Sequence, residues 1–162
     1  EEFYSPRAYR AKMKSPVELI VGASRTMGAS TNGRLMGRQA EQMGQTLLSP
    51  PDVSGWPGGA TWINSTTLLQ RMNLANTLTV GSSRRALDTS QLFQRPEPLG
   101  TREATELFIN LFLDGSMPRE EQDVLWAYLA ARNGGHVPKT LDQRALLGLV
   151  YLLMSSPDYQ LA

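Results

Sequence analysis

A proline-, glycine- and tryptophan-rich stretch, residues 43–64, constrains the fold most, because it separates helix-like segments yet is too long for an ordinary turn. It holds three of the ten prolines and two of the three tryptophans. Glycines permit positive φ and prolines fix φ, so the chain can turn sharply on either side of Trp56. Large indoles argue against disorder. We therefore predict an ordered loop whose tryptophans, Trp56 and Trp62, pack against neighbouring helices. The residues expected to shape this loop are Pro50, Pro51, Gly55, Pro57, Gly58 and Gly59.

The same stretch also has the composition of a ligand site, and the residues leave both interpretations open. An exposed face of Trp56 or Trp62 can stack on a sugar ring or a peptide. Asp52, Asn64 and Arg71 can then hydrogen-bond its polar groups, with Arg71 reaching back toward Asp52 or the loop carbonyls. For Arg71 we favour a structural, hydrogen-bonded role over anion binding. The alternative, which we favour, is an internal structural staple: a loop whose buried indoles hold the surrounding helices together. Burial of both indoles would support the staple.

Helical periodicity dominates the rest of the chain, and no segment alternates as a strand does. Ser15 and Glu18 form a capping box around Pro16. Thr101 is expected to cap a later helix, and Thr140 with Gln143 to form a second capping box. The final helix is apolar on nearly all sides and is expected to be central. These patterns predict an all-α fold, an irregular bundle of about six helices with one long ordered loop. The expected helices span about residues 15–27, 33–43, 65–81, 101–113, 118–132 and 140–154.

The polar, proline-containing region near residues 82–100 is the expected linker, with a brief helical turn at residues 87–93. Residues 1–14 are expected to form an N-terminal arm or the start of a fragment. Residues 15–81 would carry the helices that flank the loop. Residues 101–162 would form a three-helix unit packed as one domain with them.

Composition argues against several functions. A formal net charge of +1 gives no case for nucleic-acid binding. The chain has no cysteine, which excludes disulfides and iron–sulfur clusters, and one histidine, His136, in a glycine-flanked turn. We therefore predict no metal site, no cofactor and no catalytic residue, and we lean against an enzyme. The longest apolar run, residues 146–154, is too short to span a bilayer, so no transmembrane segment is expected.

Several segments resemble the C-terminal part of a bacterial family known as domain of unknown function 1800. They are residues 14–19 (KSPVEL), 43–45 (MGQ), 50–59 (PPDVSGWPGG), 62–65 (WINS), 71–73 (RMN) and 152–160 (LLMSSPDYQ). Asp52 stands where the family pattern often has asparagine. The resemblance implies an exported protein, located in the periplasm or at the cell surface, and longer than this chain at its N-terminal side. It brings no established activity and no catalytic residue.

Residues and resemblance together predict a helical interaction or scaffold module of an exported bacterial protein. Its expected partner is another protein, within a surface or periplasmic assembly, or the absent N-terminal part of its own parent chain. The alternative function is binding of a small carbohydrate or peptide ligand at the tryptophan loop. A hydrolase is the least favoured reading.

Overall fold

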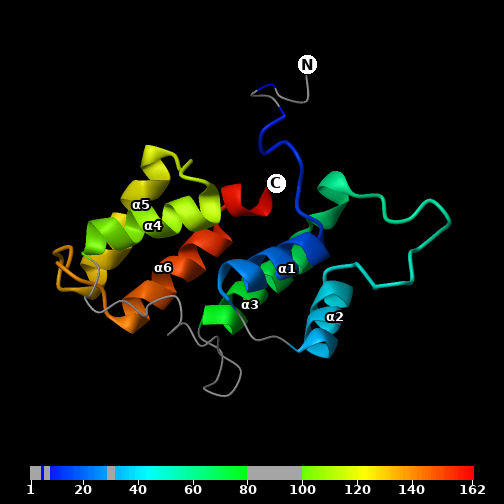
Figure 1. The fold of residues 1–162 in the computed structure, drawn as a ribbon, viewed down its shortest axis with the longest axis horizontal. Helices are drawn as coiled ribbons and strands as arrows, with labels where there is room; N and C mark the ends of the chain where they lie inside the picture. Colours follow the sequence, from blue (N-terminus) through cyan, green and yellow to red (C-terminus); the bar gives the residue numbers. More distant parts are fainter. Residues whose placement is uncertain (1–4, 6–7, 29–31, 80–99) are drawn as a thin grey trace.

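The described part of the chain is all-α, as predicted. The computed structural model describes residues 5, 8–28, 32–79 and 100–162. Within them the chain forms six α-helices and two 3-10 helices, with isolated bridges but no strand (Figure 1). The α-helices are α1 (Pro16–Thr26), α2 (Gly33–Gln42), α3 (Ser65–Thr79), α4 (Thr101–Leu113), α5 (Arg119–Arg132) and α6 (Gln143–Ser155). The 3-10 helices are η2 (Gly59–Trp62) and η3 (Asp158–Gln160). The predicted linker, up to residue 99, and its helical turn lie outside the described residues.

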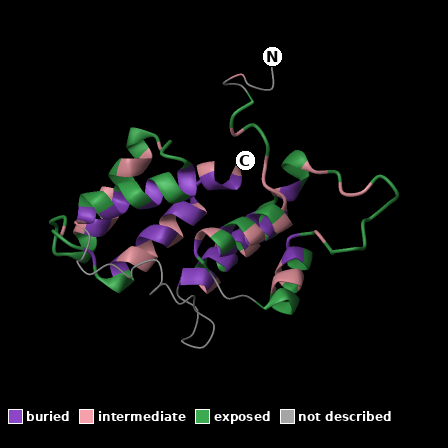
Figure 2. Ribbon diagram, in the orientation of Figure 1, coloured by how far each residue is buried: buried purple, intermediate pink, exposed green. Residues whose placement is uncertain are grey.

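Helix α6 is central, as its apolar sequence predicts. It packs against α3, α4, α5 and η3, and Figure 2 shows buried residues along its length. Leu149 and Leu153 on α6 are fully buried and share one hydrophobic core with Phe108 of α4 and Leu74 of α3. Residues from both sides of the undescribed segment therefore contribute to the same core. No helix in the described ranges is both long and apolar enough to cross a membrane.

Side chains and local geometry explain where the helices begin. The capping box at α1 is present: Ser15 Oγ accepts from the backbone N–H of Glu18, whose carboxylate accepts from Ser15 N–H at 2.8 Å. Two other predicted caps are wrong. Thr101 is the first helical residue of α4, because its hydroxyl donates to the carbonyl of Pro138 instead. Asp142 caps α6, accepting from the N–H of Ala145 at 2.7 Å.

The N-terminal arm is fastened to the C-terminal end of the chain. Lys14 N–H donates to the carbonyl of Gln160 at 2.8 Å, and Ala162 N–H donates to that of Lys12 at 2.7 Å. The Arg10 side chain donates to the carbonyl of Leu113, the last residue of α4, and to that of Ser116 in the following turn. The carbonyl of Lys14 also accepts from buried Arg71 of α3, so the arm lies against α3 as well.

Candidate functional site

The predicted loop projects away from the helical body between α2 and η2 (Figure 1). We call residues 44–58 the projecting loop. Its residues are mostly exposed, as Figure 2 shows. Leu48 is 99% exposed, Val53 is completely exposed, and half of Leu47 is in solvent. The surrounding helices therefore do not enclose this loop, in contrast to the expected internal staple.

Short-range hydrogen bonds shape the outer part of the loop. Asp52 accepts from both the N–H and the hydroxyl of Ser54, and these bonds hold the pKa of its carboxyl below the ordinary range. The N–H of Gly55 donates to the carbonyl of Asp52 at 3.2 Å, closing a turn. Gly55 and Gly58 have φ of 92° and 72°, the conformation for which glycine is needed. Leu48 has φ of 61°, which is unusual for a branched apolar residue.

Trp62 holds the inner end of the loop in the protein body. Its side chain is 7% exposed, and its carbonyl accepts from the hydroxyl of Thr67 at 2.9 Å. Asn64 caps α3, because its side-chain oxygen accepts from Thr67 N–H at 2.9 Å. Thr67 Oγ1 in turn accepts from Asn64 N–H. Trp62 therefore supports the start of α3 from the interior, whereas Asn64 caps α3 and remains exposed to solvent.

Trp56 differs from Trp62 in its burial. It is partly exposed, and it follows the turn at Gly55, whereas Trp62 belongs to a short helix that leads directly into α3. The expectation that both indoles lie among helices holds for Trp62 alone. Nothing in the composition of the stretch distinguishes the two tryptophans.

Arg71 bonds neither Asp52 nor a loop carbonyl, and its partners lie in the N-terminal arm and in η3. It is 2% exposed on α3. One terminal nitrogen donates to the carbonyl of Lys14 at 2.8 Å and the other to Gln160 Oε1 at 3.2 Å. Its Nε is buried and has no hydrogen-bond partner within the described residues. Burial lowers the pKa of the guanidinium, but Arg71 acts here as a structural connector of three chain segments.

The five predicted ligand-binding residues are therefore not gathered into one pocket. Trp62 and Arg71 are buried, Asn64 is exposed at the start of α3, and Asp52 and Trp56 lie on the projecting loop. In the parts of the chain that the structure describes, no three metal-ligating side chains form a group that could hold an ion. His136 lies in an exposed turn.

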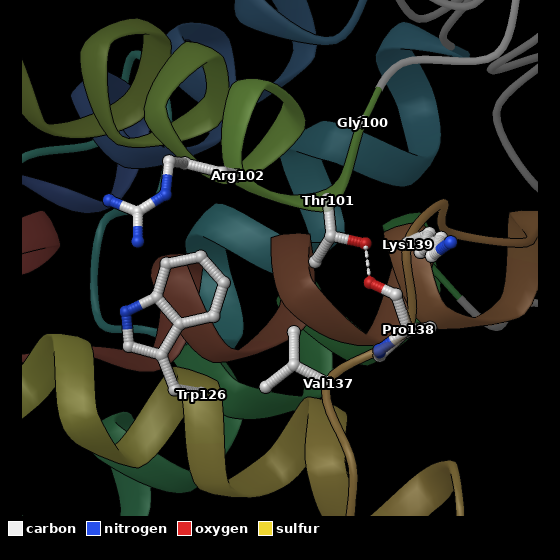
Figure 3. A pocket seen from close by; sticks show the side chains of 7 residues that line it. All are labelled: Gly100, Thr101, Arg102, Trp126, Val137, Pro138 and Lys139. Atoms are coloured by element: carbon white, nitrogen blue, oxygen red, sulfur yellow. Dashed lines mark hydrogen bonds between the residues drawn. The ribbon is translucent and has the colours of Figure 1, made fainter.

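A cleft that the sequence does not reveal is lined by seven residues, which Figure 3 shows from close by. Its volume is about 560 Å³. It lies between the start of α4, the middle of α5 and the turn before α6. In the sequence, Trp126 looks like any other apolar residue of a helix. The cleft becomes apparent only in the structure, where the turn before α6 packs against α4. The lining residues are Gly100, Thr101, Arg102, Trp126, Val137, Pro138 and Lys139.

The fold and the loop together define an all-α module with a projecting, partly apolar loop. The family model described as protein of unknown function (DUF1800) matches residues 1–161, and the chain belongs to this family. No curated protein and no solved structure is significantly similar to the chain.

Proposed function

We propose that this chain is a helical protein-interaction module that contacts a partner protein through the projecting loop. The observation that carries the proposal is the exposure of Leu47, Leu48 and Val53 on one loop. Burying apolar surface releases about 25 cal/mol per Å², so these side chains gain free energy only when a second surface covers them. Exposed apolar residues gathered on one element are typical of interaction sites.

The backbone of Leu48 adds a second reason. A left-handed conformation costs an L-residue about 1–2 kcal/mol, and no burial of the Leu48 side chain offsets this cost in the isolated chain. Strained residues persist where the surrounding structure or a function requires them. Contact between Leu48 and an apolar pocket on a partner would provide the missing stabilisation.

The fixed inner end of the loop also favours binding. Buried Trp62 and the Asn64–Thr67 hydrogen bonds tie it to α3, while the turn from Asp52 to Gly55 shapes its outer part. Binding by a loop that is already shaped loses less conformational entropy. The family resemblance adds the expected setting, an exported protein in the periplasm or at the cell surface, where the partner would belong to the same assembly.

Mutation of the exposed aliphatic residues tests this proposal. The chain is tagged, expressed in its native host, and purified with the proteins bound to it in fixed stoichiometry. The double variant Leu48→Asp/Val53→Asp is expected to lose that complex, because two charges would enter an apolar contact. Val124→Asp is the matched control, since Val124 is 61% exposed on α5.

Two results would contradict the proposal. One is a complex that survives the double loop substitution. The other is purification of a free monomer alone, confirmed by analytical ultracentrifugation. Circular dichroism verifies that each variant retains the helical fold.

Small-ligand binding remains the second candidate, because Trp56 and Asp52 are both accessible on the same loop. An indole face with a nearby carboxylate is suited to a sugar ring. Titration with glycans should then change tryptophan fluorescence in the wild type but not in Trp56→Phe. Unchanged wild-type emission across the glycans would count against this candidate.

A further inference from the structure

We propose that the cleft between α4, α5 and the turn before α6 binds a small aromatic carboxylate, a molecule with a flat apolar ring and one anionic group. The cleft is independent of the projecting loop and of the protein-interaction proposal. Its volume of about 560 Å³ falls within the range of small-molecule sites. The argument rests on its walls, its charges and its aromatic surface.

Backbone hydrogen bonds hold the walls of the cleft together. Thr101 N–H donates to the carbonyl of Lys139 at 2.9 Å, and the Thr101 hydroxyl donates to that of Pro138 (Figure 3). A bridge between Gly100 and Thr140 continues this pairing. The turn before α6 is therefore tied to the start of α4, and the cleft is formed before any ligand arrives.

The charges of the lining residues favour an anion. Arg102 supplies a cation beside Trp126, Lys139 supplies a second at the other end of the cleft (Figure 3), and none of the seven lining residues is acidic. Within the described part of the chain, neither cation is paired with a carboxylate. The first turn of α4 adds a positive dipole end with no side-chain cap, although the same turn also holds Glu103, which does not line the cleft. A ligand carboxylate can accept two parallel hydrogen bonds from the Arg102 guanidinium.

The apolar surface of the cleft favours a flat ring beside that anion. The partly buried indole of Trp126 lies between Arg102 and Val137 in Figure 3. The Arg102 guanidinium carbon is 6.0 Å from the centre of the Trp126 ring, at the outer limit of a cation–π contact. Val137 is 46% exposed and adds an aliphatic wall. Inorganic phosphate would leave these surfaces in water, whereas an aromatic acid covers them.

The test uses 1-naphthylacetate as the probe and 1-naphthylacetamide as its neutral counterpart. The chain is labelled with ¹⁵N, and its three tryptophan indole N–H signals are followed during titration. Trp126→Phe identifies the signal of Trp126. We expect a saturable shift of that signal with the acid, and at least about tenfold weaker binding of the amide.

Charge variants complete the test. Arg102→Gln/Lys139→Gln is expected to weaken the acid at least about tenfold, because both cations are removed. Arg34→Gln, an exposed cation on α2 away from the cleft, is the matched control and should bind normally. Equal binding of acid and amide would overturn the proposal, as would shifts confined to the signals of Trp56 or Trp62. The absence of saturable binding up to about 5 mM would also overturn it.

Discussion

Two glycine-to-alanine substitutions inside helices are expected to change stability in opposite directions. Gly22 lies within α1, and a Cβ added there would meet no atom within 4 Å. Gly148 lies within α6, and a Cβ added there would overlap the hydroxyl oxygen of Tyr128 and lie 2.8 Å from its Cζ. Tyr128 belongs to α5, so this contact is where two helices approach closely.

The two magnitudes follow from helix propensity and packing. Alanine is better than glycine in a helix interior by about 0.8–1 kcal/mol, so Gly22→Ala should stabilise the protein by roughly that amount. The same gain applies at position 148. There, however, displacing the Tyr128 ring adds an overpacking cost of about 1–3 kcal/mol. Gly148→Ala should therefore lower the free energy of unfolding by up to about 2 kcal/mol.

Urea denaturation of the single variants and of a double-mutant cycle measures both terms. In the Tyr128→Ala background the clash is absent, so Gly148→Ala should become stabilising by about 1 kcal/mol. The coupling between positions 128 and 148 should then be about 1–3 kcal/mol. If Gly148→Ala stabilises the wild type as much as Gly22→Ala does, the close packing of α5 on α6 is refuted.

Two further predictions concern polar groups in the interior. Arg71→Met should destabilise the protein, because the Lys14 carbonyl and Gln160 Oε1 lose their hydrogen-bond donor. Each unsatisfied group costs about 1–3 kcal/mol of folding free energy, and removal of the buried charge offsets part of that cost. Arg71→Lys should lose less, and an unchanged urea midpoint in Arg71→Met would contradict the structural role. Burial, and then the nearby Asp158, raise the pKa of Glu121, so its ionised form destabilises the fold at neutral pH. Glu121→Gln should therefore raise the urea midpoint at neutral pH. The gain should fade below about pH 4, where the carboxyl is protonated in the unfolded chain as well. An equal gain at neutral pH and below about pH 4 would contradict this account.

Local sequence signals found the helices well, and they were least reliable at caps. Ser15 and Glu18 form their capping box because both groups lie within one turn and need no distant partner. The hydroxyl of Thr101 could likewise cap the first turn of its helix, yet it donates to the carbonyl of Pro138, which is 37 residues away. A cap is predictable from sequence only where no tertiary acceptor competes for the side chain.

The candidate sites show the same limit. Composition located the projecting loop, but it could not tell that Trp62 is buried and Trp56 partly exposed. It left Arg71 either as a structural arginine or as a partner of the loop, and only the fold shows that Arg71 bonds the N-terminal arm and η3. The cleft around Trp126 was missed, since its residues come from three separate segments.

The sequence by itself determined the all-α class, the approximate extent of each helix, the irregular loop and the central place of α6, because these follow from periodicity and from the φ preferences of proline and glycine. Which indole is covered, what Arg71 bonds and where a cleft opens became visible in the folded molecule alone. Burial and hydrogen-bond partners depend on residues distant in the chain, and Gly22 and Gly148 differ only through what packs against them.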